Sequence, residues 1–100
     1  MSTVFLNGEY MPLESARVPV LDRGFIFGDA VYEVIPVYNR RIFRLDDHLR
    51  RLQHSLDAIR LANPYTEARW RELIAPVIAR AETDDQGIYL QITRGPAPRD

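Results

Sequence analysis

Short apolar runs separated by turn residues open the chain, and this pattern is typical of β-strands. Residues 3–6 predict a first strand. Asn7 and Gly8 follow it and predict a tight hairpin turn, because both residue types tolerate a positive φ. Residues 9–11 are then expected to be the returning strand, so the chain is predicted to begin with a β-hairpin.

A second strand region follows a stretch that is rich in turn-forming residues. Residues 13–21 predict irregular structure, and residues 22–29, which carry two glycines, predict a shaped loop. Residues 30–38 are rich in Val, Ile and Tyr and predict a strand onto which residues 41–43 pair back. Pro36 inside this strand cannot donate a hydrogen bond to a neighbouring strand, so it indicates an edge or a bulge.

The spacing of apolar residues lengthens to three and four positions in the second half of the chain, which predicts helices. A first helix is expected over residues 45–61, where leucines line one face, and Asn63 and Pro64 are expected to end it. Thr66 is a suitable N-cap for a second helix. Pro76 falls inside the apolar stripe of that second helix, so we expect a kink or a restart there.

The last predicted strand covers residues 88–94, where aliphatic and polar side chains alternate. The order of elements is therefore hairpin, hairpin, helix, helix and strand, which is an α+β pattern and not a βαβ repeat. We expect residues 1–100 to form one small α+β domain with antiparallel strands and two helices. Because no closing element follows the last strand, we also expect this domain to be truncated.

Composition narrows the functional classes. The chain has 100 residues, a formal net charge of −1 and no cysteine. Such a balanced charge argues against a nucleic-acid or anionic-membrane partner, and the lack of cysteine excludes disulfides and thiolate metal sites. No apolar run reaches the length of a membrane span, and the start of the chain has no secretory pattern. We therefore expect a cytoplasmic protein that binds neither nucleic acid nor membrane.

Three motifs carry a resemblance to a known family. They are DRGFIFGDAVYEV at residues 22–34, FRLDDHLRRL at 43–52 and QITRGPAPR at 91–99. In this order and spacing they resemble the class IV, or fold-type IV, pyridoxal-phosphate-dependent aminotransferases, and among these the D-amino acid aminotransferases. Branched-chain aminotransferases and aminodeoxychorismate lyases remain as alternatives. The resemblance covers essentially the whole chain and implies the small N-terminal domain of such an enzyme.

The resemblance implies binding roles for three residues. Arg51 would bind the cofactor phosphate, since a guanidinium meets phosphate oxygens through a bidentate fork, and the alternative is a solvated helix arginine. Tyr32 would line the substrate pocket, and the alternative is an ordinary half-buried strand tyrosine. Arg99 would belong to the trap for the substrate carboxylate, contributed across a dimer interface, and the alternative is a disordered terminal residue.

Glu33 and His48 are candidates for supporting roles. Glu33 lies on the opposite strand face from Tyr32, among apolar neighbours, so its carboxylate needs a partner. Arg51 or a lysine of the complete enzyme could pair with it, unless Glu33 simply reaches water at a strand edge. His48 belongs to the helix motif and is expected to be structural, without a metal-binding role.

The family holds its cofactor, pyridoxal 5'-phosphate, on a lysine amine, yet all thirteen basic residues here are arginine. The resemblance thus implies a homodimeric parent enzyme that moves an amino group from a D-amino acid to a 2-oxo acid. It also implies that this chain alone lacks the catalytic lysine, does not bind the cofactor by itself and is inactive. A non-catalytic dimerising module is the alternative function for the isolated chain.

Overall fold

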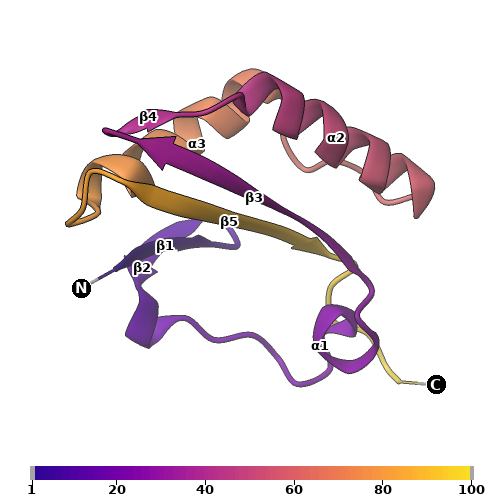
Figure 1. Ribbon diagram of the computed structural model, residues 1–100. Coiled ribbons are helices and arrows are strands. Elements are labelled where there is room, and N and C mark those ends of the chain that lie inside the picture. The colour runs from indigo at the N-terminus through magenta and orange to yellow at the C-terminus, as the bar shows by residue number, and fades with distance from the viewer. Residues whose placement is uncertain (1, 100) are drawn as a thin grey trace.

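The computed structural model describes residues 2–99 and has the predicted α+β class, with antiparallel pairing in both of its sheets (Figure 1). In chain order the elements are β1 (Thr3–Leu6), β2 (Glu9–Pro12), the 3-10 turn η1 (Leu13–Ser15), α1 (Arg23–Phe27), β3 (Ala30–Tyr38), β4 (Arg41–Ile42), α2 (Leu45–Ala58), α3 (Glu67–Arg80) and β5 (Gln86–Thr93). Helices α2 and α3 cover one face of a three-stranded sheet, and the β1–β2 hairpin lies apart from it.

The N-terminal hairpin forms as its turn residues predict. Asn7 and Gly8 both have a positive φ, 49° and 94°, and Leu6 pairs with Glu9 across the turn. The hairpin is attached to α3, because the Tyr10 hydroxyl donates a hydrogen bond of 2.7 Å to the carbonyl oxygen of Leu73. Local turn chemistry thus makes the hairpin, and a single long-range hydrogen bond helps to place it.

The main sheet has the order β4-β3-β5, and β3 pairs with β5 in one continuous register over eight residue pairs. Pro36 lies within that register, so of the two predicted alternatives, an edge or a bulge, the bulge is not formed. The Phe43 amide donates to the Pro36 carbonyl at 2.8 Å, which means that the Pro36 nitrogen also faces the β4 side. Pro36 cannot return a hydrogen bond to Phe43, and strand β4 ends at Ile42, so pairing on this side of β3 stops at Pro36, as at a strand edge.

The two faces of this sheet differ sharply in exposure. The face toward α2 and α3 is buried, and its core side chains include Ile35, Val37, Ile88 and Leu90 from the strands, Leu49, Leu52 and Leu56 from α2, and Trp70 and Ile74 from α3. The other face leaves Tyr32, Val34 and Tyr89 exposed. Strand alternation alone produces this division, and it determines which side chains can meet a ligand.

Helix α2 is shorter than predicted, and α3 is one continuous helix. Helix α2 ends at Ala58, before the predicted end at residue 61. Its last turn closes in a Schellman arrangement: Leu61 N donates to Leu56 O, and Arg60, at a φ of 55°, takes the left-handed position that glycine usually fills. Helix α3 runs through Pro76 without a restart, and the Thr66 hydroxyl caps it as predicted.

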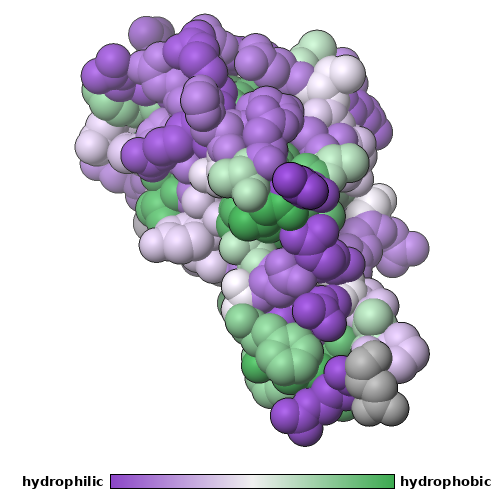
Figure 2. Space-filling model, turned by 90° about the vertical axis from the view of Figure 1, so that its right-hand side faces the viewer, coloured by the Kyte–Doolittle hydropathy of each residue, from purple (hydrophilic) through white to green (hydrophobic). Residues whose placement is uncertain are grey.

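A short helix occupies the segment that was predicted to be a loop. Helix α1 begins after Asp22, whose carboxylate accepts a hydrogen bond of 2.8 Å from Gly24 N, and ends at Gly28, which has a φ of 66°. Figure 2 shows apolar surface on the lower part of the molecule, where α1 and the end of the chain lie. Phe25 and Phe27 of α1 are 72% and 50% exposed.

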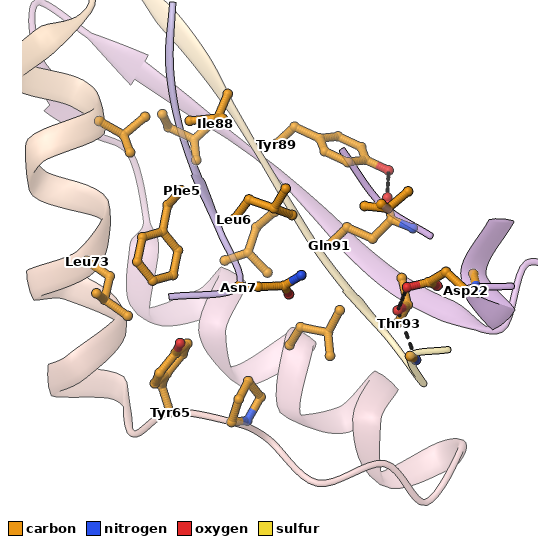
Figure 3. Close-up of a pocket in the computed structure, with 18 of the residues that line it drawn as sticks. Phe5, Leu6, Asn7, Asp22, Tyr65, Leu73, Ile88, Tyr89, Gln91 and Thr93 are labelled. Atoms are coloured by element: carbon orange, nitrogen blue, oxygen red, sulfur yellow. Dashed lines mark hydrogen bonds between the residues drawn. The ribbon is translucent and has the colours of Figure 1, made fainter. Parts of the chain in front are cut away.

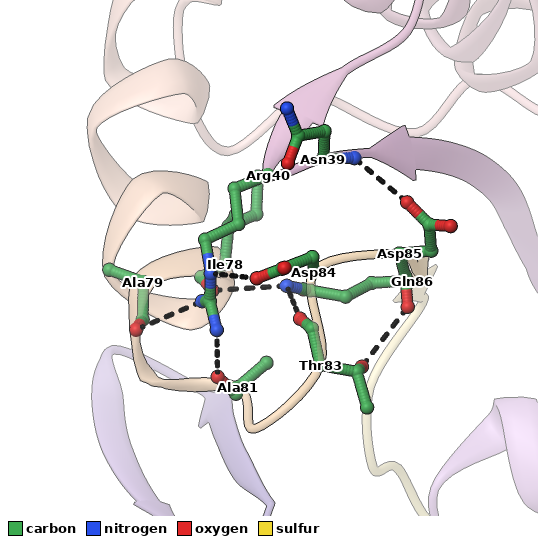
Figure 4. A network of polar contacts seen from close by, with 9 residues as sticks. All are labelled: Asn39, Arg40, Ile78, Ala79, Ala81, Thr83, Asp84, Asp85 and Gln86. Atoms are coloured by element: carbon green, nitrogen blue, oxygen red, sulfur yellow. Dashed lines mark hydrogen bonds and ion pairs between the residues drawn. The ribbon is translucent and has the colours of Figure 1, made fainter.

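The end of α3 is held by a side chain from the β3–β4 turn (Figure 4). The Arg40 guanidinium donates to the carbonyl oxygens of Ile78 at 3.0 Å and Ala81 at 2.9 Å, and it pairs with Asp84 at 2.9 Å. A cation at this position adds charge-assisted hydrogen bonds to carbonyl oxygens at the end of the helix and complements the helix dipole. Arg40 therefore joins α3 to the sheet.

We predict that Arg40→Ala lowers the free energy of unfolding by about 1–2 kcal/mol, because several charge-assisted hydrogen bonds to helix carbonyls are lost at a partly exposed site. Denaturant unfolding followed by circular dichroism measures the change. Arg41→Ala, at the neighbouring exposed position, is the matched control and should change stability by less than about 0.5 kcal/mol. Equal effects of the two substitutions would contradict the proposed capping role.

Candidate functional site

A buried carboxylate lies at the centre of the candidate site. Glu33 belongs to β3 and points to the helix-covered face, between Val31 and Ile35, with a side chain that is only 3% exposed. Removing a carboxylate from water is costly unless charged or hydrogen-bonding groups replace the water. The neighbouring helix provides such groups.

Helix α2 supplies two partners for Glu33. The Arg51 guanidinium donates from Nε to Oε2 at 2.9 Å and from Nη2 to Oε1 at 2.8 Å, which is the fork geometry of a bidentate pair. His48 Nδ1 lies 2.6 Å from Oε1. His48 and Arg51 are three residues apart on the helix, so both side chains project from the same helical face.

These contacts determine the protonation of the cluster. Burial acts to raise the pKa of Glu33, but the hydrogen bonds and charges of Arg51 and His48 outweigh it, so this pKa lies below the ordinary glutamate value. An ionised carboxylate can only accept hydrogen bonds, so the proton in the short contact belongs to His48 Nδ1. The sequence suggested Arg51 as a partner of Glu33 but not His48. The three-residue spacing between His48 and Arg51 on one helix is the signal that could have indicated it.

The outer side of Arg51 remains accessible. Its side chain is 66% exposed, and within residues 2–99 its Nη1 has no hydrogen-bond partner. A shallow depression at this point is lined by Arg44, Asp47, His48 and Arg51. A guanidinium that is fixed along one edge and open along the other suits a phosphate group. Arg50 differs, because it points into solvent and pairs with Asp47 at 3.0 Å.

Tyr32 lies on the opposite, open face of the same strand. It is 61% exposed, more than the half-buried alternative would require, and its ring stacks on that of Tyr89 with centroids 5.6 Å apart. Val34 beside them is also exposed. The sequence did not single out Tyr89, but the alternation in β5 puts it on the face opposite the core residues Ile88 and Leu90. The pair forms an aromatic surface with two hydroxyl groups.

The segment that carries Arg99 runs beside α1 (Figure 1). Asp22 forms a bridge with Pro96, Arg23 N donates to Gly95 O at 2.9 Å, and Ala97 N donates to Leu21 O at 3.4 Å. Arg99 itself is exposed. No contact within the described part of the chain joins Arg99 to Glu33, Arg51 or Tyr32, so the structure brings only Glu33 and Arg51 of these four residues together.

A large hollow lies elsewhere, between the hairpin, α3 and β5 (Figure 3). Its walls are mainly apolar and include Phe5, Leu6, Tyr65, Leu73 and Ile88. None of the predicted site residues lines it. Among the described residues that line it, only Asp22 is charged, so the hollow lacks the converging charged groups that would bind a phosphate or a carboxylate.

Two other kinds of site are absent from residues 2–99. No group of three or more His, Cys, Asp or Glu side chains there is arranged to hold a metal ion. Among the same residues, no helix has both the length and the apolar character that a membrane span requires.

Comparisons with known proteins agree on a single family. A family profile described as "Amino-transferase class IV" matches residues 30–100. The chain is 39% identical over 99 residues to the D-alanine aminotransferase of Staphylococcus epidermidis, with 99% of this chain and 35% of that protein covered. It is 41% identical over 96 residues to that of Bacillus licheniformis, covering 96% of this chain and 34% of that protein.

Solved structures give the same answer at lower identity. A branched-chain amino acid aminotransferase complexed with N-(5'-phosphopyridoxyl)-L-glutamate is 27% identical, with a TM-score of 0.88 over 97% of this chain and 34% of that one. The branched-chain aminotransferase from Thermoproteus uzoniensis is 28% identical, with a TM-score of 0.83 over 99% of this chain and 36% of that one. The chain thus spans about a third of the length of the proteins it matches. It belongs to the class IV aminotransferase family and has the α+β fold of the N-terminal domain of fold IV aminotransferases.

Proposed function

We propose that these residues form the small-domain part of a longer, pyridoxal-phosphate-dependent transaminase that moves an amino group from a D-amino acid to a 2-oxo acid. The observation that carries this proposal is the clamp on Arg51, whose guanidinium is fixed by buried Glu33 and open on its outer edge. An enzyme that uses a phosphate-bearing cofactor needs a fixed cationic group that can bind the phosphate.

The choice of D-amino acids follows from the relatives. Curated relatives named D-alanine aminotransferase share 36–41% of their aligned residues with this chain. The solved structures named branched-chain aminotransferase share 27–28%. The higher identity, together with the Arg94 to Arg99 motif, favours the D-amino acid reaction over the branched-chain one.

Each of the four candidate residues has a proposed role. Arg51 would hold the cofactor phosphate, and Glu33 would orient Arg51 so that no binding energy is spent on ordering its side chain. Tyr32, with Tyr89 stacked on it, would offer a ring and a hydroxyl group to the substrate. Arg99 would bind the substrate carboxylate, in a homodimer that brings it to the site of a second subunit. When bound, the cofactor supplies the electron sink for chemistry at the substrate's α-carbon.

The isolated chain would be inactive in this scheme. It has no lysine, so it has no ε-amino group to hold the cofactor or to move the α-proton. After mixing with cofactor and reduction with borohydride, mass spectrometry should find no adduct on any side chain. Such an adduct would contradict the proposal. The exposed aromatic face would also suit the alternative function, a dimerising module. The Arg51 clamp favours the catalytic assignment.

The stereochemistry of the amino donor tests the proposed reaction. We expect the full-length enzyme to aminate a 2-oxo acid with D-alanine at a kcat/KM far above that with L-leucine or L-valine. Coupled assays with each donor, at matched concentrations, measure the three values. Preference for the L-donors would support the branched-chain alternative and would overturn the D-amino acid assignment.

Arg51→Ala tests the cofactor site. Loss of a charge-assisted hydrogen-bonded pair should weaken cofactor affinity in the full-length enzyme by roughly 10- to 150-fold. Titration of the apoenzyme with cofactor, followed by fluorescence, measures the dissociation constant. Arg50→Ala removes the neighbouring solvated arginine and should leave that constant within about 2-fold of its original value. Unchanged affinity in Arg51→Ala would remove the phosphate role from this residue.

A further inference from the structure

One carboxylate outside the Arg51 clamp holds two arginines from distant parts of the chain. Asp29 follows α1 and directly precedes β3, and its side chain is 19% exposed. The same oxygen, Oδ2, accepts from Arg23 Nε at 3.0 Å and from Arg94 Nε at 2.9 Å. These hydrogen bonds keep the pKa of Asp29 below its ordinary value. The aspartate is therefore a charged junction between the first and third sequence motifs.

Arg94 extends this junction to α2. Its amide donates to the Asp29 carbonyl oxygen at 3.1 Å, and its Nη2 donates to the Ile59 carbonyl oxygen at 2.6 Å, at the end of that helix. Arg94 therefore contacts the start of β3 and the end of α2 at once. It is the residue at which the chain leaves β5 toward Arg99.

A second, buried contact holds the same exit. Asp22 is 8% exposed, and its Oδ2 accepts from the Thr93 hydroxyl at 3.1 Å (Figure 3). The Thr93 hydroxyl oxygen in turn accepts from Gly95 N at 3.0 Å. The fit is tight, because a Cβ added at Gly24 would lie 2.4 Å from the Thr93 methyl carbon. The exit from β5 thus has little freedom to shift against α1.

The direction of the Arg99 segment follows from these contacts. Gly95 has a φ of 86°, which turns the chain, and residues 95–97 are then bound along residues 21–23. Arg99 comes two positions after the last of these anchored residues. Its own side chain is exposed and has no partner within the described residues that would fix it. Its placement depends on the segment before it.

We propose that Asp29 is a positioning residue for recognition of the substrate carboxylate. It fixes Arg94 and Arg23, which fix the exit from β5 and thereby the approach of Arg99 to the substrate. This inference rests on the proposed function, in which Arg99 binds the α-carboxylate. The junction lies outside the buried apolar core, so its loss should affect substrate recognition more than folding.

The test compares two substrates in the full-length enzyme. One is a D-amino acid, and the other is the corresponding amine that lacks the carboxylate. The measured quantity is the ratio of kcat/KM for the amino acid to kcat/KM for the amine. Asp29→Asn should lower this ratio by roughly 10-fold, because one charged hydrogen-bonded junction is lost. The change should come from a higher KM for the amino acid. Cofactor affinity should stay unchanged. Asp84→Asn is the matched control, since it breaks the Arg40–Asp84 pair at the opposite end of β3 and should leave the ratio unchanged.

Two further variants separate the possible failures. Arg99→Ala should also lower the ratio, and adding Asp29→Asn to it should lower the ratio no further, because the two residues act on one interaction. Arg94→Lys keeps the charge but loses the fork to Asp29 and Ile59, and it should lower the ratio even where Asp29→Asn folds poorly. An unaffected ratio in Arg99→Ala would overturn the carboxylate role in the proposed function. Two results would overturn the positioning role alone. One is a ratio that falls in Arg99→Ala but stays unaffected in Asp29→Asn and Arg94→Lys. The other is an equal loss of kcat/KM on both substrates in Asp29→Asn and Arg94→Lys.

Discussion

The ion pair between buried Glu33 and Arg51 is the interaction on which the arrangement of this molecule depends. A carboxylate on the covered face of a central strand would destabilise the fold if it were left alone. Arg51 and His48 compensate it through four charge-assisted or short hydrogen bonds from one face of α2. The pairing therefore fixes how α2 lies on β3. Loss of one partner would leave an uncompensated charge inside the protein.

The same ion pair connects the fold to the proposed chemistry. Because Glu33 binds one edge of the Arg51 guanidinium, the other edge must face outward, where a phosphate can reach it. Strand alternation then puts Tyr32 on the open face, next to Glu33 in sequence but on the other side of the sheet. One strand thus separates the group proposed to hold the cofactor from the group proposed to meet the substrate.

Local sequence signals predicted much of this fold. Asn7 and Gly8 determined the hairpin, and apolar spacing located both long helices and β5. The end of α2 was not predicted, because Arg60 adopts a left-handed conformation that sequence rules assign to glycine. Helix α1 was missed although local residues cap it, Asp22 at its start and Gly28 at its end. Its two glycines favoured a loop, and further contacts that hold it come from Thr93 and Gly95, some seventy residues away.

The candidate site was predictable to a similar degree. The resemblance indicated Arg51, and the need of a buried carboxylate for a partner indicated the Glu33–Arg51 pair. His48 became part of the cluster only when the helix was placed on the strand. The junction at Asp29 is local on one side, because Arg23 lies six residues before Asp29. Its other half is tertiary, since Arg94 meets Asp29 only when the end of β5 lies beside the start of β3.

The titration of the Glu33 carboxyl group tests this account most directly. Carbon-13 NMR of the labelled chain follows that group as pH is lowered. We predict a pKa below the ordinary value of 4.5, and a rise in that pKa when Arg51 is replaced by alanine. Since the folded-state pKa is the lower one, the pair should stabilise the fold above pH 4.5, and this stability should fade as pH falls through the folded-state pKa. A Glu33 that titrates above 4.5, or that does not respond to Arg51→Ala, would contradict the central role of the ion pair.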